Sequence, residues 1–398
     1  MKIIHTSDWH LGSRLYNYDR TDEEEHFFRQ LSEVVERERP DVLAVGGDIY
    51  HTGAPGNDVA KRFTECLLDV VEKCPGMETV VIAGNHDSYS RLVVDEALWK
   101  RFHVHVFGRP AENDEGQAVF EDNIVELPGK GIMAAVPFCH PRNFPLVAGA
   151  AGEDREKEYF KGLEKRVKER ANGLPTVLMA HLAVSGELDF RGHDKSLVIG
   201  GEECVDVENL GSGYDYVALG HIHCPQWIKG GRRFVRYCGT PYAIHFDEMY
   251  AHGVDIVTVE AGREPLVRTE VLEPVHELVT LGGEEGLPFD KALECVQEVT
   301  LPADTYIRIN VRLGAGELPG PDWSERARRA CADKGLRFCV NNPVRTASPD
   351  NAESKKMLSM AELKELSDDE VLEILSARHE MSPRQRELVK TLMKEVLA

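Results

Sequence analysis

The chain has 398 residues, with 47 lysines and arginines against 68 aspartates and glutamates, which gives a formal net charge of −21. Apolar, charged and aromatic fractions of 42%, 29% and 7% are those of a folded globular protein and exclude a disordered chain. The acidic balance excludes a broadly basic nucleic-acid coat, so a nucleic-acid contact has to be local or bridged by metal cations. The length predicts two or three domains.

The first 110 residues alternate short apolar runs with amphipathic helical patterns. Three apolar runs predict buried strands: Lys2–Thr6, Asp41–Val45 and Thr79–Ala83. Thr21 followed by Glu24 predicts a capping box at the start of one helix, and a second helix is predicted from about Asn57. Strands that alternate with helices predict crossover connections and a largely parallel sheet.

A second set of strands follows from about residue 117. Runs at Asn123–Leu127 and Ile132–Val136 flank Pro128–Gly131, which predicts a hairpin, and a charged helix is predicted over about 153–171. Four further strands are predicted: Thr176–Ala180, Tyr216–Leu219, Arg232–Tyr237 and Val254–Val259. We therefore expect residues 1–270 to form one large α/β domain.

The remaining chain predicts a small module and a tail. Residues 275–345 combine helical patterns with alternating strands, above all Ile307–Leu313, whose polar face carries Arg308 and Arg312. These arginines are candidate DNA contacts if the module caps the active site; otherwise they belong to a solvated strand face. Residues 346–398 read as a polar linker followed by C-terminal helices.

Cysteine usage and hydropathy bear on the cellular compartment. The nine cysteines are scattered and form no C-x-x-C pair, which argues against a disulfide framework and against a thiolate zinc site. The first residues lack a basic region followed by an apolar run, and no apolar stretch reaches 18 residues. We expect a cytoplasmic protein with no membrane span.

Five segments place a His, Asp or Asn directly after a predicted strand. They are Asp8-Trp9-His10, Gly47-Asp48, Gly84-Asn85-His86-Asp87, Ala180-His181 and Gly220-His221-Ile222-His223. The carboxyl ends of parallel strands lie at one edge of a sheet, where ligands bind, so these side chains are expected to converge. Each motif alone is common by chance, whereas all of them in order at strand ends indicate a site.

The residue types indicate which ligand the site holds. Carboxylates, an amide and imidazoles without a thiolate suit manganese, iron or zinc ions. Asp8 and His10 are two residues apart on an extended segment and can face the same side, as can His221 and His223. A shared carboxylate holds two cations about 3.5–4 Å apart, which suits phosphoryl transfer.

In this order, the motifs resemble those of the calcineurin-like metallophosphoesterases. The segments His5–Gly12, Gly47–Thr52, Ala83–Ser88 and Arg236–Pro241 are similar to the nuclease branch of that superfamily, which includes the double-strand-break repair nucleases and the nuclease subunit of the bacterial SbcC–SbcD exonuclease. The resemblance implies an α/β fold: a two-sheet sandwich flanked by helices, a small α+β capping domain at 275–345 for DNA contact, and a C-terminal helical tail.

The resemblance also implies two metal sites that share one carboxylate, that of Asp48. One site would hold Asp8, His10, Asp48 and His223. The other would hold Asp48, Asn85, His181 and His221. Both ions are usually manganese in such enzymes, with Mg²⁺, Fe²⁺ or Zn²⁺ as alternatives.

Three further residues receive catalytic roles from the same resemblance. His86 would protonate or stabilise the leaving oxygen, since histidine is the side chain that titrates near neutral pH. Asp87 would orient the His86 ring. His51 is similar to a histidine that assists phosphate positioning in some relatives.

The implied function is a DNA nuclease that acts in repair, recombination and replication. It would be an exonuclease on duplex ends and an endonuclease on single-stranded or hairpin DNA. Its partner would be an SbcC-type ATPase with a coiled coil, in a heterotetramer that contains a homodimer of this chain. An apolar stripe after Pro383 would bind that partner, unless it packs on its own domain; it consists of Leu388, Leu392 and Val396 with Val389, Met393 and Leu397 beside them.

Two other functions compete with this hypothesis. The first is a phosphatase or cyclic-nucleotide phosphodiesterase that uses the same metal site. The second is a metal-holding scaffold without activity, although such a scaffold would be expected to have lost ligands or the proton donor.

Overall fold

The computed structural model describes residues 1–150, 154–185, 204–228, 234–314 and 317–345. Among these residues, no helix combines the length and the hydropathy that a membrane span requires. The predicted tail, 346–398, with its stripe after Pro383, lies outside the described residues. By its internal contacts, the chain divides into two compact units. Among the described residues, the first comprises those of Met1–Thr280, Thr300–Arg308 and Arg328–Val340, and the second comprises those of Leu281–Val299, Ile309–Ala327 and Asn341–Arg345.

The first sheet of the larger unit contains the predicted N-terminal strands. Its strands lie in the order β14 (Leu266–Val271), β13 (Gly253–Thr258), β1 (Lys2–Thr6), β4 (Val42–Val45), β5 (Glu78–Ile82) and β6 (Val104–Phe107). β1, β4, β5 and β6 run parallel; at one side, β13 pairs antiparallel with β1, and β14 pairs antiparallel with β13. The predicted crossover units are confirmed, with strand bounds within about one residue of the prediction.

The second sheet contains the later strands. Its strands lie in the order β11 (Gln226–Trp227), β12 (Val235–Tyr237), β10 (Tyr216–Gly220), β9 (Thr176–His181), β8 (Gly131–Val136) and β7 (Ile124–Leu127). β7 and β8 form the predicted antiparallel hairpin, whereas β8, β9, β10 and β12 run parallel. Apolar side chains from both sheets form one buried cluster between them, including Ile3, Val80, Met133 and Met179. The unit is therefore a two-sheet sandwich.

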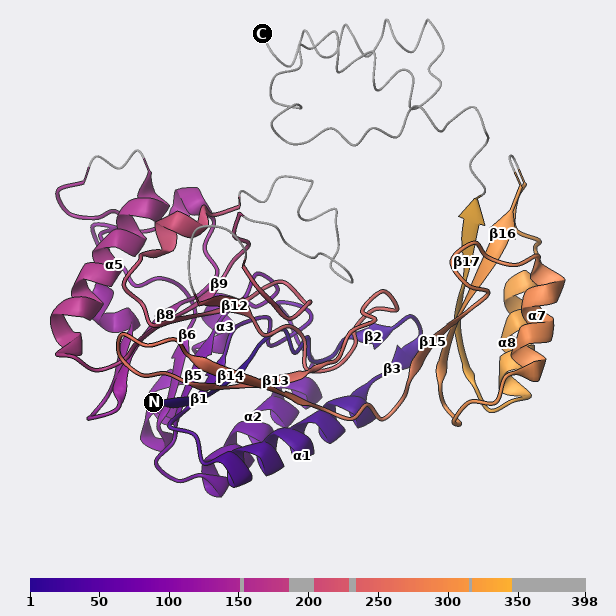
Figure 1. Cartoon of the computed structure of the whole chain (residues 1–398), viewed down its shortest axis with the longest axis horizontal. Helices are drawn as coiled ribbons and strands as arrows, with labels where there is room; N and C mark the ends of the chain where they lie inside the picture. Colours follow the sequence, from indigo (N-terminus) through magenta and orange to yellow (C-terminus); the bar gives the residue numbers. More distant parts are fainter. Residues whose placement is uncertain (151–153, 186–203, 229–233, 315–316, 346–398) are drawn as a thin grey trace, which may run out of the picture. The chain divides into compact units, whose positions relative to one another are not determined.

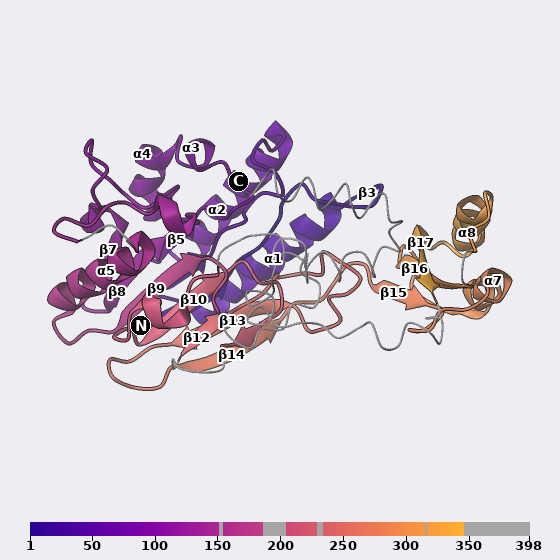
Figure 2. The same cartoon turned by 90° about the horizontal axis from the view of Figure 1, so that it is seen from above.

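Helices cover the outer face of each sheet (Figure 1). α1 (Thr21–Glu38) and α2 (Asn57–Lys73) pack on the first sheet, and α5 (Arg155–Ala171) packs on the second. α3 (Tyr89–Leu92) and α4 (Glu96–Trp99) join the layer of α2 (Figure 2). The minor elements are β2 (Arg14–Leu15), β3 (Tyr18–Asp19) and the short 3₁₀ helices η1 (Lys100–Phe102), η2 (Phe120–Asn123), η3 (Pro141–Asn143) and η4 (Val207–Leu210).

The capping box predicted at Thr21 is wrong. Thr21 is already the first helical residue, Arg20 occupies the N-cap position, and the Thr21 N–H donates to Asp19 Oδ1 at 3.0 Å. Glu24 instead turns away from the helix terminus, where its carboxylate accepts the Gly12 N–H at 2.7 Å and pairs with Arg62 at 2.7 Å. Long-range partners thus override the local capping pattern.

The chain after residue 275 has the predicted small α+β composition. It holds a three-stranded sheet in the order β15 (Leu278–Leu281), β16 (Tyr306–Leu313), β17 (Arg337–Arg345), together with α7 (Phe289–Glu298) and α8 (Trp323–Ala332). In the second unit, the Phe289 and Trp323 rings stack with centroids 4.4 Å apart. The domain boundaries predicted at 1–270, 275–345 and 346–398 stay predictions.

The two arginines of β16 differ in exposure. Arg308 is not solvent-facing as predicted: its side chain is 17% exposed, and its Nη1 lies 2.7 Å from Asp247 Oδ1. Its Nε also donates to Thr280 Oγ1 at 3.0 Å, and its guanidinium lies over the Phe246 ring. Arg312 is exposed, as expected. The DNA contact hypothesis therefore has to rest on Arg312 rather than on both residues.

Candidate metal centre

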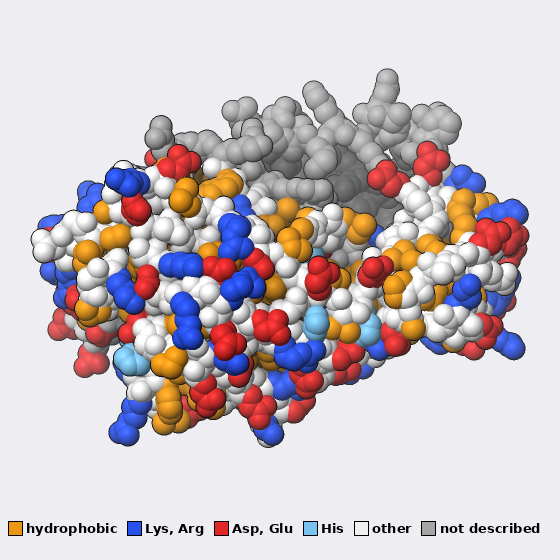
Figure 3. Space-filling view, turned by 60° about the horizontal axis from the view of Figure 1, so that its bottom comes forward, with side chains coloured by type: hydrophobic (Ala, Val, Ile, Leu, Met, Phe, Trp, Pro, Cys, Tyr) orange, Lys and Arg blue, Asp and Glu red, His pale blue; other side chains and the backbone are white. Residues whose placement is uncertain are grey.

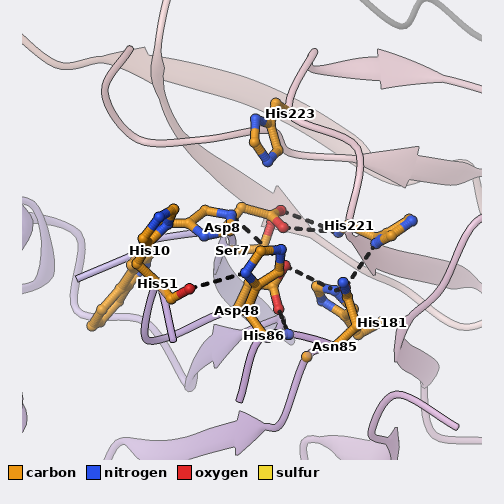
Figure 4. A network of polar contacts seen from close by, with 12 residues as sticks. Ser7, Asp8, His10, Asp48, His51, Asn85, His86, His181, His221 and His223 are labelled. Atoms are coloured by element: carbon orange, nitrogen blue, oxygen red, sulfur yellow. Dashed lines mark hydrogen bonds and ion pairs between the residues drawn. The ribbon is translucent and has the colours of Figure 1, made fainter. Parts of the chain in front are cut away.

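The predicted ligands come together at the carboxyl ends of strands from both sheets (Figure 4). The first sheet supplies the residues that follow β1, β4 and β5, which are Asp8, His10, Asp48 and Asn85. The second sheet supplies the last residue of β9 and the residues after β10, which are His181, His221 and His223. The site therefore forms only when the two sheets are packed together.

The ligand atoms form groups that share side chains. Within each group the atoms lie within 4.8 Å of one another: Asp8 with His10 and His223; Asp48 with His181 and His221; His10 with His51 and His86. Asp48 Oδ2 lies 3.4 Å from His181 Nε2 and 3.7 Å from His10 Nε2, so one carboxylate reaches two groups. Asn85 Oδ1 lies 3.0 Å from both His181 Nε2 and His221 Nδ1. The geometry fits a bridging role for Asp48 and places Asn85 beside the second group.

The donor atoms are arranged as a cation requires. His181 Nδ1 donates to the Gly46 carbonyl at 2.7 Å, so its Nε2 lone pair faces the oxygens of Asn85 and Asp48. Burial opposes a charge on His181, but the Asp48 carboxylate outweighs it and raises the pKa of His181 to about 9. A cation, whether a proton or a metal ion, therefore belongs between these acceptors.

His10 offers a second test of the fit. It is buried, and neither of its ring nitrogens has a hydrogen-bond partner among the described residues. Burial holds the pKa of His10 well below its usual value, so the ring is neutral, as a metal ligand must be. For Asp48, burial alone would raise the pKa, but the neighbouring His181 keeps it well below the ordinary range. The centre combines anionic oxygens with imidazole nitrogens and is a site for divalent metal ions.

Backbone strain concentrates at the same residues. Asp8, His10, Asp48 and His221 have φ angles of 56°, 46°, 48° and 107°, in the region that side chains other than glycine seldom adopt. Such conformations cost about 1–3 kcal/mol each and persist at functional sites, where the surrounding structure enforces them. With these backbone conformations, the four side chains lie at the ends of their strands, where the site forms (Figure 4).

Backbone amides and one hydroxyl hold the two carboxylates in place. Asp8 accepts the His221 N–H at 3.0 Å and the Ser7 hydroxyl at 2.5 Å. Asp48 Oδ1 accepts the His86 N–H at 2.8 Å. A Cβ at Gly84 would overlap Asp48 Oδ1, so only glycine lets this carboxylate lie where it does.

His86, His51 and Asp87 lie on the more accessible side of the centre. His86 Nδ1 donates to the His51 carbonyl at 3.0 Å, and the two rings stack 5.9 Å apart. The Asp87 carboxylate accepts the N–H groups of Gly84, Tyr50 and Ile49 at 2.8, 2.9 and 3.1 Å. Burial, with the charge of Asp48, raises the pKa of Asp87 to about 6. These hydrogen bonds link the loop after β4 to the loop after β5. Asp87 was predicted to orient the His86 ring, but in these contacts its carboxylate accepts backbone N–H groups instead.

Sequence reasoning missed the residues that support the ligands from behind. Glu248 Oε1 lies 2.8 Å from His223 Nδ1, and the exposed His245 ring stacks on the His223 ring at 6.4 Å. Both residues lie in the loop between β12 and β13, well after the end of β12 and outside the five motifs that predicted the ligands. Ser7, whose hydroxyl donates to Asp8, was also missed. Its position next to a predicted ligand is the sequence feature that could have pointed to it.

The family description "Calcineurin-like phosphoesterase" matches residues 1–225, a span that runs from before Asp8 to beyond His223 and covers more than half of the chain. The chain belongs to the calcineurin-like phosphoesterase family. All the predicted ligands of this phosphoesterase lie inside the matched span, whereas Glu248 and His245 lie beyond it.

Several curated relatives of this phosphoesterase carry one name, that of the D subunit of the SbcCD nuclease. The protein of this name from Rhodobacter capsulatus is 29% identical over 315 residues, 76% of this chain and 76% of its own length. Its namesake from Bacillus subtilis is 29% identical, over 72% of this chain and 73% of its own. A solved dimetal phosphatase from Danio rerio covers 68% of this chain and 98% of its own, at 11% identity and a TM-score of 0.39; a match so distant adds nothing to the family assignment.

Proposed function

We propose that this phosphoesterase is a two-metal DNA nuclease, the counterpart of the SbcD proteins that it resembles. The observation that carries the proposal is the convergence of carboxylates, an amide and imidazoles from two sheets, with Asp48 within reach of both ligand groups. The names of the relatives support nuclease activity, since the similarity spans about three quarters of each chain. We propose manganese as the metal, with magnesium, iron or zinc as alternatives.

The assigned ligands follow the two groups. Asp8, His10, Asp48 and His223 hold one ion. Asp48, Asn85, His181 and His221 hold the other. When bound, such a pair of ions activates water and neutralises the charge that develops on phosphate oxygens.

The protein's own residues then act on the leaving group. Because His86 Nδ1–H is committed to the His51 carbonyl, His86 Nε2 is the ring nitrogen left to give a proton to the leaving 3′ oxygen. Asp87 acts as a positioning residue: its bonds to backbone N–H groups fix the loops that carry Asp48 and Asn85. His51 fixes the His86 ring through its carbonyl and offers its own ring to the phosphate.

The experiment uses linear duplex DNA and hairpin DNA, with Mn²⁺ added to the chelator-treated protein. We expect Mn²⁺-dependent release of nucleotides from duplex ends and cleavage of the hairpin. Asp48→Asn should lose both ions in a calorimetric titration and lose cleavage, while its unfolding curve without metal stays near that of the wild type. Hydrolysis of only a small phosphodiester would favour a phosphodiesterase instead, and metal binding without any hydrolysis would favour a scaffold.

DNA binding is expected to be local and shared with a partner. On the face drawn in Figure 3, basic and acidic side chains are interspersed, which agrees with the overall charge of −21. We propose that an SbcC-type ATPase supplies further DNA affinity and that the complex works in repair and recombination in the cytoplasm. Deleting residues 346–398 should abolish co-purification with that ATPase, and retained co-purification would place the partner contact elsewhere.

An exposed apolar strip supports a homodimer within that complex. Four exposed apolar side chains lie close together in the sequence: Tyr89 on α3, Val94 in the turn between α3 and α4, Leu98 on α4 and Phe102 on η1. We propose that a second copy of the chain covers this strip. Leu98→Glu should convert the dimer to a monomer in light scattering, whereas an unchanged mass would refute this interface.

A further inference from the structure

Glu248 is a buried carboxylate behind the metal centre, outside the set of predicted ligands. The residue is 4% exposed. Its Oε1 accepts the His223 Nδ1–H at 2.8 Å, and its Oε2 accepts the Ile244 N–H at 2.7 Å. The second bond fixes the carboxylate to the backbone of its own loop, so Glu248 is a rigid acceptor rather than a mobile acid.

The partner of a ligand histidine decides which nitrogen faces the metal. Because Glu248 takes the Nδ1–H of His223, Nε2 carries the lone pair and belongs to the group with Asp8 and His10. His181 is oriented in the same way, but by a neutral backbone carbonyl, that of Gly46. An anionic partner makes the imidazole a stronger ligand than a carbonyl does. The two ligand groups are therefore supported differently.

We propose that Glu248 is a positioning residue that locks His223 in the Nδ1–H form and strengthens the metal site of Asp8, His10 and His223. This inference rests on the proposed two-metal function and adds a residue beyond the matched family span. Glu248 acts through His223 and is not itself a ligand: it is absent from the groups whose ligand atoms converge among the described residues. Removing it should weaken one site and spare the other.

The test measures Mn²⁺ binding by titration calorimetry of the full chain. Glu248→Ala should weaken one of the two Mn²⁺ sites by about 10–100-fold and leave the other at wild-type affinity. Glu248→Gln retains one oxygen where the carboxylate has two, so it should lose less Mn²⁺ affinity than the alanine variant. If Glu248→Ala does not fold, Glu248→Gln alone tests the proposal. In ¹⁵N spectra of the metal-free protein, the His223 ring should be the Nδ1–H form in the wild type, shift away from it in Glu248→Ala, and shift less in Glu248→Gln.

Asp247→Asn is the matched control. It removes one carboxylate from the adjacent position, but Asp247 is 68% exposed and pairs with Arg308. We expect wild-type Mn²⁺ affinity at both sites. If Glu248→Ala and Glu248→Gln bind both ions like the wild type, or weaken both sites equally along with stability, Glu248 is only structural and the inference falls. If the wild type binds no Mn²⁺, or Asp48→Asn keeps both ions, the proposed function fails instead.

Discussion

The ion pair of Arg236 and Asp255 joins the two sheets that carry the metal ligands. Arg236 lies on β12 of the second sheet, and Asp255 lies on β13 of the first. The contact is bidentate: Nε lies 2.6 Å from Oδ2 and Nη2 lies 3.0 Å from Oδ1. The side chains are 10% and 0% exposed, and Thr269 Oγ1 donates to Oδ1 at 2.6 Å.

Replacing Arg236 by leucine should cost far more than replacing both partners. Arg236→Leu leaves a buried carboxylate with Thr269 as its remaining donor among these contacts, and breaking such a pair costs about 3–5 kcal/mol. That is a large part of the roughly 5–15 kcal/mol by which domains are stable. The double variant Arg236→Leu/Asp255→Leu removes the stranded charge, so it should lie within about 1 kcal/mol of the wild type or above it.

Urea unfolding of the metal-free protein, followed by circular dichroism, measures these free energies. Arg263→Leu removes an exposed arginine paired with Glu260 and should change the free energy of unfolding by less than about 1 kcal/mol. A loss below about 1 kcal/mol in Arg236→Leu, or an equal loss in the double variant, would refute this reasoning.

Three further predictions concern the site and the pH dependence of stability. His86→Ala should keep both Mn²⁺ ions in calorimetry but slow DNA cleavage by about 10²–10⁴-fold, and loss of an ion would make His86 a ligand instead. Gly84→Ala should displace the Asp48 carboxylate and reduce Mn²⁺ affinity in the same titration, whereas wild-type affinity would contradict the close packing described. Burial raises the pKa of Glu156 to about 7, so the folded state resists its ionisation. The wild type should therefore lose roughly 2 kcal/mol relative to Glu156→Gln between pH 5 and 8 in urea unfolding, and parallel pH profiles would exclude this.

The strands and the residues of the metal centre could be predicted because both depend on local patterns. Apolar runs of four or five residues gave β1, β4 and β5, and the polar residues that follow each run gave Asp8, Asp48 and Asn85. Strand direction then brings distant segments to one edge without any knowledge of packing. The local patterns alone did not reveal that the edge belongs to two sheets, since none of them records which strands pair; the two-sheet sandwich was expected only from the family resemblance.

Predictions failed where a distant partner decides the outcome. Glu24 fits a capping box by its spacing, but Gly12 and Arg62 take its carboxylate. His5 is fully buried, and its Nδ1 lies 3.0 Å from the Tyr216 hydroxyl of the other sheet, a contact that no local pattern indicates. Glu248 stands 25 residues from His223 in a loop without periodicity, so only the folded structure identifies it.

The apolar residues between the ligands explain how the strained centre is kept in place. Three of the five motifs place a fully buried apolar side chain next to a ligand: Trp9 between Asp8 and His10, Ile49 after Asp48, and Ile222 between His221 and His223. Trp9 and Ile49 join the core under α1 and α2, whereas Ile222 joins the core under α5. Burying such a side chain contributes about 1.5–3 kcal/mol, comparable to the cost of one left-handed backbone residue. The same short motifs thus supply both the metal ligands and the anchors that offset their strain, one set on each side of the sandwich.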